Sequence, residues 1–227
     1  MFGGAFDPPH LAHLRLAQTA IDELSLDELV VIPTGKGPHK LRELSSPLDR
    51  LKMCQLAFQG LERARVDDCE LSRDGVSYSF DTLVQLSAKN PDADLYLVIG
   101  ADQAYVFDTW YKWEAILEIA TLAVAQREPQ IKADTAVKIT IETTPKDHSI
   151  EVGRYRWHNR GLIERTRDFR GRTHAEVAVT LNMPSMSVSA TQIRHSIQEG
   201  VDVSHLLNPA VHTYILAHSL YIPKSST

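Results

Sequence analysis

The segment GGAFDPPHLAH, residues 3–13, decides the fold of this chain. Its glycines let the backbone approach an anion closely, and its prolines stand just before an apolar pattern of helical period. That pattern places His10 at a helix start and His13 in the first turn, so both rings can face one ligand. Because a helix N-terminus favours negative charge, the segment predicts a phosphate-binding turn. The alternative is an ordinary helix after a proline break, with both histidines at the surface.

The length favours one domain that spans residues 1–227, and the charge means that any site for a polyanion must be local. The 24 basic and 29 acidic residues give a net charge of −5, which predicts neither a nucleic-acid nor a membrane partner. No apolar run is long enough to cross a membrane, and Met1-Phe2 leads directly into the glycines rather than into a signal region. We therefore expect a cytoplasmic protein whose Cys54 and Cys69 are buried, reduced thiols. The oligomeric state stays open, a homo-oligomer included.

Strand and helix patterns alternate along the chain. Continuous apolar runs typical of strands buried on both faces occur at 29–32, 95–99, 122–125 and 177–181. Helical patterns occur at 11–24, 46–58, 79–88 and 110–119, and two more helices begin at Ser189 and Asn208. The alternation predicts an α/β domain with a mostly parallel sheet and a C-terminal helical segment. Only two residues precede the glycines, so either the chain begins upstream or the sheet has an unusually short strand.

Residues 128–174 interrupt this alternation. They are polar, carry two prolines and show no sustained periodicity, which predicts an insertion or a lid. Residues 151–174 hold seven arginines against three acidic residues, a balance that would suit a cover over an anionic ligand. A solvated, charged loop is the commoner explanation, so these arginines are assigned no role in a site.

A second helix start could bind phosphate. Ser189 and Gln192 have capping-box spacing after a strand-like run, which leaves the Thr191 hydroxyl free in the first turn. Arg194 shares that face, and a hydroxyl, a guanidinium and backbone N–H groups together suit terminal phosphates. The alternative is a well-capped surface helix. Lys40 adds an ammonium group in the loop after the strand at 29–32, so three clusters follow predicted strands, where α/β sheets bind ligands.

These motifs resemble a known superfamily. GGxFDPxHxxH from Gly3 to His13 and SxTxxR from Ser189 to Arg194 are similar to the signatures of the nucleotidyltransferases related to class I tRNA synthetases. Within that superfamily the chain most resembles the bacterial nicotinate-nucleotide adenylyltransferases, through residues 32–40, 77–83 and 99–111. Ala5 and Ala12 depart from the usual threonine and glycine, so Ala5 offers no hydroxyl to the phosphate turn.

The resemblance implies a fold, a reaction and a metal. The fold is Rossmann-like, a mostly parallel sheet with helices on both faces. The reaction is adenylyl transfer in NAD biosynthesis, in which ATP and nicotinate mononucleotide give nicotinate adenine dinucleotide and pyrophosphate. Mg²⁺ would be bound chiefly through the ATP phosphates, and no residue is assigned as a metal ligand.

The resemblance also implies roles for individual residues. The residues assigned to ATP are Gly3, Gly4, Phe6, His10, His13, Ser189, Thr191 and Arg194. The residues assigned to catalysis are His10, His13, Lys40 and Arg194. The residues assigned to nicotinate mononucleotide are Tyr78, Ser79, Gly100, Asp102 and Trp110. Trp110 would stack on the pyridine ring or be a core residue, and Asp102 would accept from ribose hydroxyls or merely cap a helix.

Two other functions stay open. One is adenylyl or cytidylyl transfer to another acceptor, such as nicotinamide mononucleotide or phosphopantetheine, although residues 77–82 and Trp110 favour nicotinate. The other is a non-catalytic nucleotide-binding protein that keeps the fold. Release of pyrophosphate from ATP in the presence of an acceptor separates the two.

Overall fold

The computed structural model describes residues 1–37, 44–104, 106–126, 150–152, 155–157, 163–164, 176–184 and 186–222. The chain divides into two compact units. Unit 1 comprises Met1–Thr82 and Met186–Thr227, and unit 2 comprises Leu83–Ser185. Both ends of the chain therefore belong to unit 1. A single domain with an insertion at 128–174 stays a prediction.

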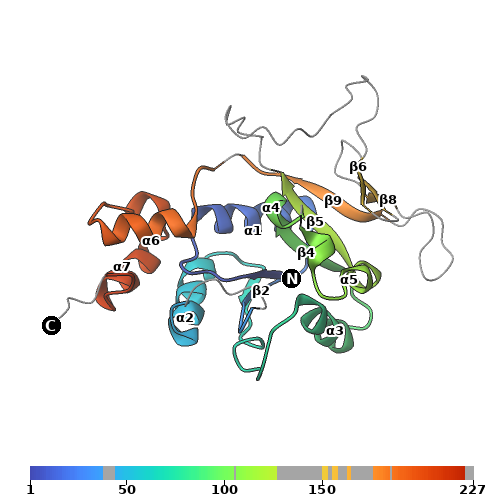
Figure 1. The fold of residues 1–227 in the computed structure, drawn as a ribbon, viewed down its shortest axis with the longest axis horizontal. Coiled ribbons are helices and arrows are strands. Elements are labelled where there is room, and N and C mark those ends of the chain that lie inside the picture. Colours follow the sequence, from blue (N-terminus) through green and yellow to red (C-terminus); the bar gives the residue numbers. More distant parts are fainter. Residues whose placement is uncertain are drawn as a thin grey trace, which may run out of the picture. The chain divides into compact units, whose positions relative to one another are not determined.

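Unit 1 is built on three parallel strands in the order β3-β2-β1 (Figure 1). They are β1 (Phe2–Gly4), β2 (Leu29–Pro33) and β3 (Ala64–Val66). Each connection runs through a helix, α1 (Leu11–Glu23) after β1 and α2 (Pro47–Phe58) after β2. All of β2 is buried, as expected for a strand with neighbours on both sides. The three-residue length of β1 places the glycines at its end, directly before the turn into α1.

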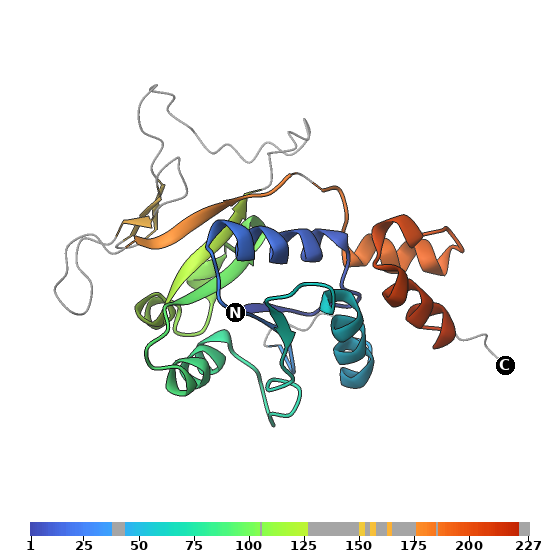
Figure 2. The same ribbon diagram turned by 180° about the vertical axis from the view of Figure 1, so that it is seen from behind.

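The C-terminal part of unit 1 is helical. It contains α6 (Ala190–Gln198), the 3₁₀ helix η2 (Ser204–Leu206) and α7 (Pro209–Ala217). Asn208 caps α7 by accepting a hydrogen bond from the Ala210 N–H at 2.9 Å, with Pro209 in the first turn. Helix α7 contacts α2, and Figure 2 shows α6 and α7 beside α2. This contact brings the last helices next to the phosphate turn.

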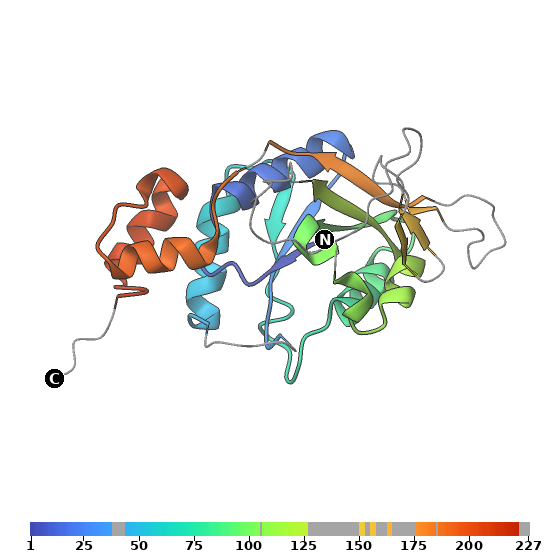
Figure 3. The same ribbon diagram turned by 45° about the horizontal axis from the view of Figure 1, so that its top comes forward.

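Unit 2 contains the remaining sheet and helices. Strands β4 (Leu95–Gly100), β5 (Ala120–Gln126) and β9 (Glu176–Asn182) pair in parallel in that order, and Figure 3 shows β9 running along β5. Beyond β9 the order continues through short antiparallel strands, β8 (Ile163–Glu164), β7 (Tyr155–Trp157) and β6 (Ile150–Val152). The helices are α3 (Ser79–Lys89), which starts in unit 1, α4 (Ala101–Ala104), the 3₁₀ helix η1 (Phe107–Thr109) and α5 (Trp113–Ile119).

The predicted strands and helices are confirmed with small shifts, β3 and α4 were not predicted, and three other features differ. The helix predicted from Trp110 begins at Trp113, because Trp110 is extended and Lys112 adopts a left-handed conformation with φ of 52°. Strands β6, β7 and β8 lie within residues 128–174, where the sequence shows no period. Both cysteines are free and Cys54 is buried, but Cys69 is only half-buried. No described helix is long and apolar enough to cross a membrane.

Candidate active site

The turn after β1 is supported from below by Phe6. Phe6 has a φ of 46°, and its ring is 2% exposed, packed edge-on against Phe2 and Phe58. A Cβ on Gly4 would lie 3.0 Å from the Phe6 ring, so the glycine permits this close approach. Gly3 is exposed. The side chain of Phe6 is buried and forms the floor of the turn, and the assignment of Phe6 to ATP stays a prediction.

The two histidines of the motif lie against each other. Their rings stack with centroids 3.8 Å apart, and Phe6 packs edge-on against His13 with centroids 5.0 Å apart. His10 is the N-cap of α1, and its backbone N–H donates to His13 Nδ1 at 3.2 Å. Because Nδ1 accepts that bond, a neutral His13 ring carries its proton on Nε2. The predicted positions, His10 at the helix start and His13 in the first turn, are confirmed.

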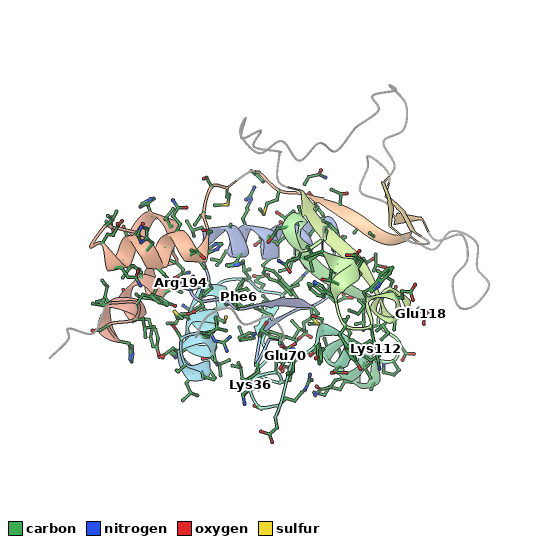
Figure 4. All side chains as sticks on the ribbon, in the orientation of Figure 1. Phe6, Lys36, Glu70, Lys112, Glu118 and Arg194 are labelled. Atoms are coloured by element: carbon green, nitrogen blue, oxygen red, sulfur yellow. The ribbon has the colours of Figure 1, made fainter. Side chains whose placement is uncertain are left out.

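Arg194 connects the second helix start to the first. Ser189 is the N-cap of α6, and its Oγ accepts from the Gln192 N–H at 3.2 Å. Arg194 Nη1 donates to the Asp7 carbonyl oxygen at 2.7 Å, across 187 positions of sequence. Figure 4 shows Arg194 on α6 and Phe6 at the end of β1. The structure therefore brings the two predicted phosphate motifs together within unit 1.

The prediction that the Thr191 hydroxyl is free is wrong. Its Oγ1 accepts a hydrogen bond from Arg194 Nη2 at 3.0 Å. The reason is the three-residue spacing on α6, which places the guanidinium over the hydroxyl. Thr191 thus orients Arg194, and its own proton remains available for donation.

Two buried charged side chains hold the phosphate turn, and sequence reasoning assigned neither a role. The Asp7 carboxylate, 1% exposed, accepts from the Tyr221 hydroxyl at 2.7 Å and from the Ser45 N–H at 3.3 Å. Arg50, 2% exposed, donates to the carbonyl oxygens of Ala5 and Thr34 from Nη1 and to that of Ser45 from Nε. A guanidinium with several carbonyl acceptors is the arrangement in which a buried arginine is stable.

Asp7 is part of the GGxFDPxHxxH motif, and Arg50 also left a signal in the sequence. It lies on the same helical face as Met53, Cys54 and Ala57, which are all buried. A charged residue on a buried, apolar helix face indicates that it has hydrogen-bond partners in the interior. Tyr221 left none, because its contact with Asp7 spans 214 positions.

A second buried carboxylate, Glu70, organises the segment that contains Tyr78 and Ser79. Thr82 Oγ1 donates to Glu70 Oε1 at 2.8 Å, and the Ser77 hydroxyl donates to the Glu70 carbonyl at 3.4 Å. A Cβ on Gly35 would lie 2.2 Å from the Glu70 carbonyl oxygen, so only glycine fits there. Burial raises the pKa of the Glu70 carboxyl. Hydrogen bonds and nearby arginines lower this pKa and so partly oppose the effect of burial. The predicted acceptor residues Tyr78 and Ser79 are half-buried directly after this cluster.

The other predicted site residues lie in unit 2 or outside the described residues. Asp102 is exposed in the first turn of α4, and its carboxylate folds toward Gly100, where a Cβ would lie 2.6 Å from Oδ1. Trp110 is half-buried against Phe107, with ring centroids 5.4 Å apart, so it is not a fully enclosed core residue. Lys40 lies outside the described residues.

The comparisons with known proteins agree with this geometry. The family model described as cytidylyltransferase-like matches residues 1–196, and the chain belongs to this family. It is therefore an enzyme of the nucleotidyltransferase class.

Its relatives narrow the class. Proteins of Albidiferax ferrireducens and Neisseria meningitidis serogroup B, both named "Probable nicotinate-nucleotide adenylyltransferase", are 39% and 33% identical. Each match covers 97% of this chain and 96% of the relative. A solved structure of Plasmodium falciparum nicotinic acid mononucleotide adenylyltransferase complexed with NaAD matches with a TM-score of 0.67 and 16% identity, over 97% of this chain and 95% of that one. The predicted fold class is thereby confirmed.

Proposed function

We propose that this enzyme transfers the adenylyl group of ATP to nicotinate mononucleotide, giving nicotinate adenine dinucleotide and pyrophosphate in the NAD biosynthesis of the cytoplasm. The hydrogen bond from Arg194 to the Asp7 carbonyl carries the proposal, because it joins two helix N-termini around one place suited to a triphosphate. The names of the full-length relatives supply the nucleotide acceptor.

The reaction needs alignment rather than a protein nucleophile. A phosphate oxygen of the mononucleotide attacks the α-phosphorus of ATP, the bond to the β-phosphate oxygen breaks, and pyrophosphate leaves from the opposite side. Negative charge spreads over the oxygens during this exchange, so fixed donors lower the barrier. We assign His10 and His13 to the α- and β-phosphates and Arg194 with Thr191 to the β- and γ-phosphates. Gly3, Gly4 and the start of α6 at Ser189 would let backbone N–H groups come close to the phosphates.

The acceptor half of the site stays a prediction from the resemblance. Trp110 is assigned to the pyridine ring, Tyr78 and Ser79 to the carboxylate of nicotinate, and Asp102 beside Gly100 to ribose. The half-buried Trp110 face is compatible with stacking. Lys40 is assigned to the leaving pyrophosphate.

Magnesium is proposed to arrive with ATP. Among the described residues no group of three or more His, Cys, Asp or Glu side chains could hold a metal ion, and the Asp7 carboxylate is already bound by Tyr221 and Ser45. The phosphate turn offers hydrogen-bond donors rather than oxygen ligands, so we place the ion on the phosphate oxygens and water. It would neutralise charge on the triphosphate, and the residues named above would orient it.

One assay tests the proposal. Purified full-length protein is given ATP and Mg²⁺ with nicotinate mononucleotide, nicotinamide mononucleotide or phosphopantetheine in turn, and dinucleotide and pyrophosphate are measured. We expect equimolar products and the highest kcat/KM with nicotinate mononucleotide. A higher kcat/KM with another acceptor would replace the substrate, and ATP binding without pyrophosphate release would indicate a non-catalytic protein.

A further inference from the structure

The C-terminal segment after α7 reaches into the phosphate turn. Tyr221 donates its hydroxyl proton to Asp7 Oδ1 at 2.7 Å, and the same hydroxyl lies 3.8 Å from Met53 Sδ. Burial and the Asp7 charge raise the pKa of the Tyr221 phenol, so it stays protonated and remains the donor. Tyr221 is not among the residues that the motifs single out.

The backbone of this segment is held in an uncommon conformation. Ser219 and Tyr221 have φ values of 49° and 67°, which residues with side chains rarely adopt. Ser219 forms the left-handed end of α7, where the N–H groups of Ser219 and Leu220 donate to the carbonyl oxygens of Leu216 and Ile215. Tyr221 lies outside that cap, and its phenol is bound to Asp7.

Asp7 transmits this contact to Arg194. Its carboxylate is bound by Tyr221 and by the Ser45 N–H, while its carbonyl oxygen is the acceptor for Arg194 at 2.7 Å. Without the phenol donor, a buried carboxylate oxygen would lose a strong hydrogen bond and would move toward water or another donor. The carbonyl of the same residue would move with it, and so would the guanidinium.

We propose that Tyr221 is a positioning residue for adenylyl transfer: through Asp7 it fixes the carbonyl that orients Arg194 toward the ATP phosphates. This inference rests on the proposed function of the site. It makes the end of the chain part of the phosphate-binding machinery, although Tyr221 itself contacts no reacting atom.

The test compares two tyrosine variants of the full-length protein. Tyr221→Phe removes the donor to Asp7, and Tyr214→Phe removes a similar bond from α7 to Asp49 Oδ1, 2.9 Å long, which does not involve Asp7. At a temperature where both variants are folded, we expect Tyr221→Phe to lower kcat/KM for ATP about tenfold, and Tyr214→Phe to change it less than about twofold. The KM for nicotinate mononucleotide should stay constant in both.

A double-mutant cycle shows whether the effect passes through Arg194. In the Arg194→Ala background, Tyr221→Phe should have no further effect on kcat/KM. An undiminished tenfold loss there, or equal kinetics of wild type and Tyr221→Phe, overturns the inference. An inactive wild type would instead refute the proposed function, so the two failures are distinguishable.

A measurement on the wild type covers the case in which Tyr221→Phe does not fold. Backbone hydrogen exchange is followed with and without ATP and Mg²⁺ in the absence of acceptor. Because coupling is reciprocal, we expect ATP to slow exchange at residues 220–222 together with residues 3–7. Slowing confined to residues 3–7 would contradict the proposed connection.

Discussion

The two buried carboxylates of unit 1 differ in how far along the chain their partners lie. Glu70 is bound by Thr82, 12 positions away, and by the Gly35 N–H, 35 positions away. Asp7 is bound by Ser45 at 38 positions and by Tyr221 at 214. The Glu70 cluster can form within the first 82 residues, whereas the Asp7 cluster requires both ends of the chain to fold together. The phosphate half of the site therefore depends on global folding and the Tyr78–Ser79 segment on local folding.

The largest expected effect is the fall in kcat when His13, whose ring packs beside the phosphate turn, is replaced. His13→Ala removes the Nε2 donor that we assign to the ATP phosphates, and loss of one such donor costs about 10²–10³ in kcat. His195→Ala, an exposed histidine on α6, is the matched control and should leave kcat within about twofold. Steady-state kinetics with ATP and nicotinate mononucleotide measure both, and near-normal turnover of His13→Ala would remove the histidines from the mechanism.

The next-largest expected effect is the loss of stability when Arg50 is replaced, because Arg50 contacts both the phosphate turn and the segment beside the Glu70 cluster. It binds the carbonyl oxygens of Ala5 in the phosphate turn and of Thr34 beside Gly35, so removing the buried guanidinium takes a donor away from both segments. We expect Arg50→Met to lower the free energy of unfolding by about 3 kcal/mol. Urea denaturation measures the loss, with Arg15→Met on the exposed face of α1 as control. Equal stability of the two variants would show that Arg50 does not hold these segments.

The contrast between the two clusters also explains what the sequence could reveal. The glycines, the prolines and the two histidines lie within residues 3–13, so the turn and the helix start follow from local rules of turn and cap chemistry. Ser189 and Arg194 likewise belong to one helix, as its N-cap and a residue of its second turn. Both motifs follow predicted strands, which predicts that the two helix starts lie close together. The hydrogen bond from Arg194 to the Asp7 carbonyl oxygen confirms this proximity.

Long-range side-chain contacts had no such local signal. Nothing near Tyr221 indicates that its hydroxyl reaches Asp7, because that contact depends on how α7 packs on α2. Lys112 likewise adopts a left-handed conformation that its residue type does not favour, which delays the start of α5. Residues 77–83 were recognised as a motif, but the bonds from Ser77 and Thr82 to the buried Glu70 had no signal in it.

A smaller effect should follow from loosening the Glu70 cluster. Thr82 is fully buried, and Thr82→Val keeps its shape while removing the donor to Glu70 Oε1. We expect the free energy of unfolding to fall by about 1–3 kcal/mol and the KM for nicotinate mononucleotide to rise, with the KM for ATP unchanged. Thr213→Val, on the exposed side of α7, is the control. A rise in the KM for ATP instead would mean that the two clusters are not independent.

The smallest effect separates the charge of Glu70 from its hydrogen bonds. Because burial raises its pKa above 4.5, the folded protein binds this proton more tightly than the unfolded chain does. Stability from this group is present below the ordinary pKa and declines as the pH rises through the raised one. Glu70→Gln, which cannot ionise, should therefore lose less stability than wild type as the pH rises from about 4.5. The exposed Glu62→Gln should follow wild type in urea unfolding across this pH range. Parallel curves for wild type and Glu70→Gln would mean that Glu70 is ionised without penalty and that its cluster fully compensates the charge.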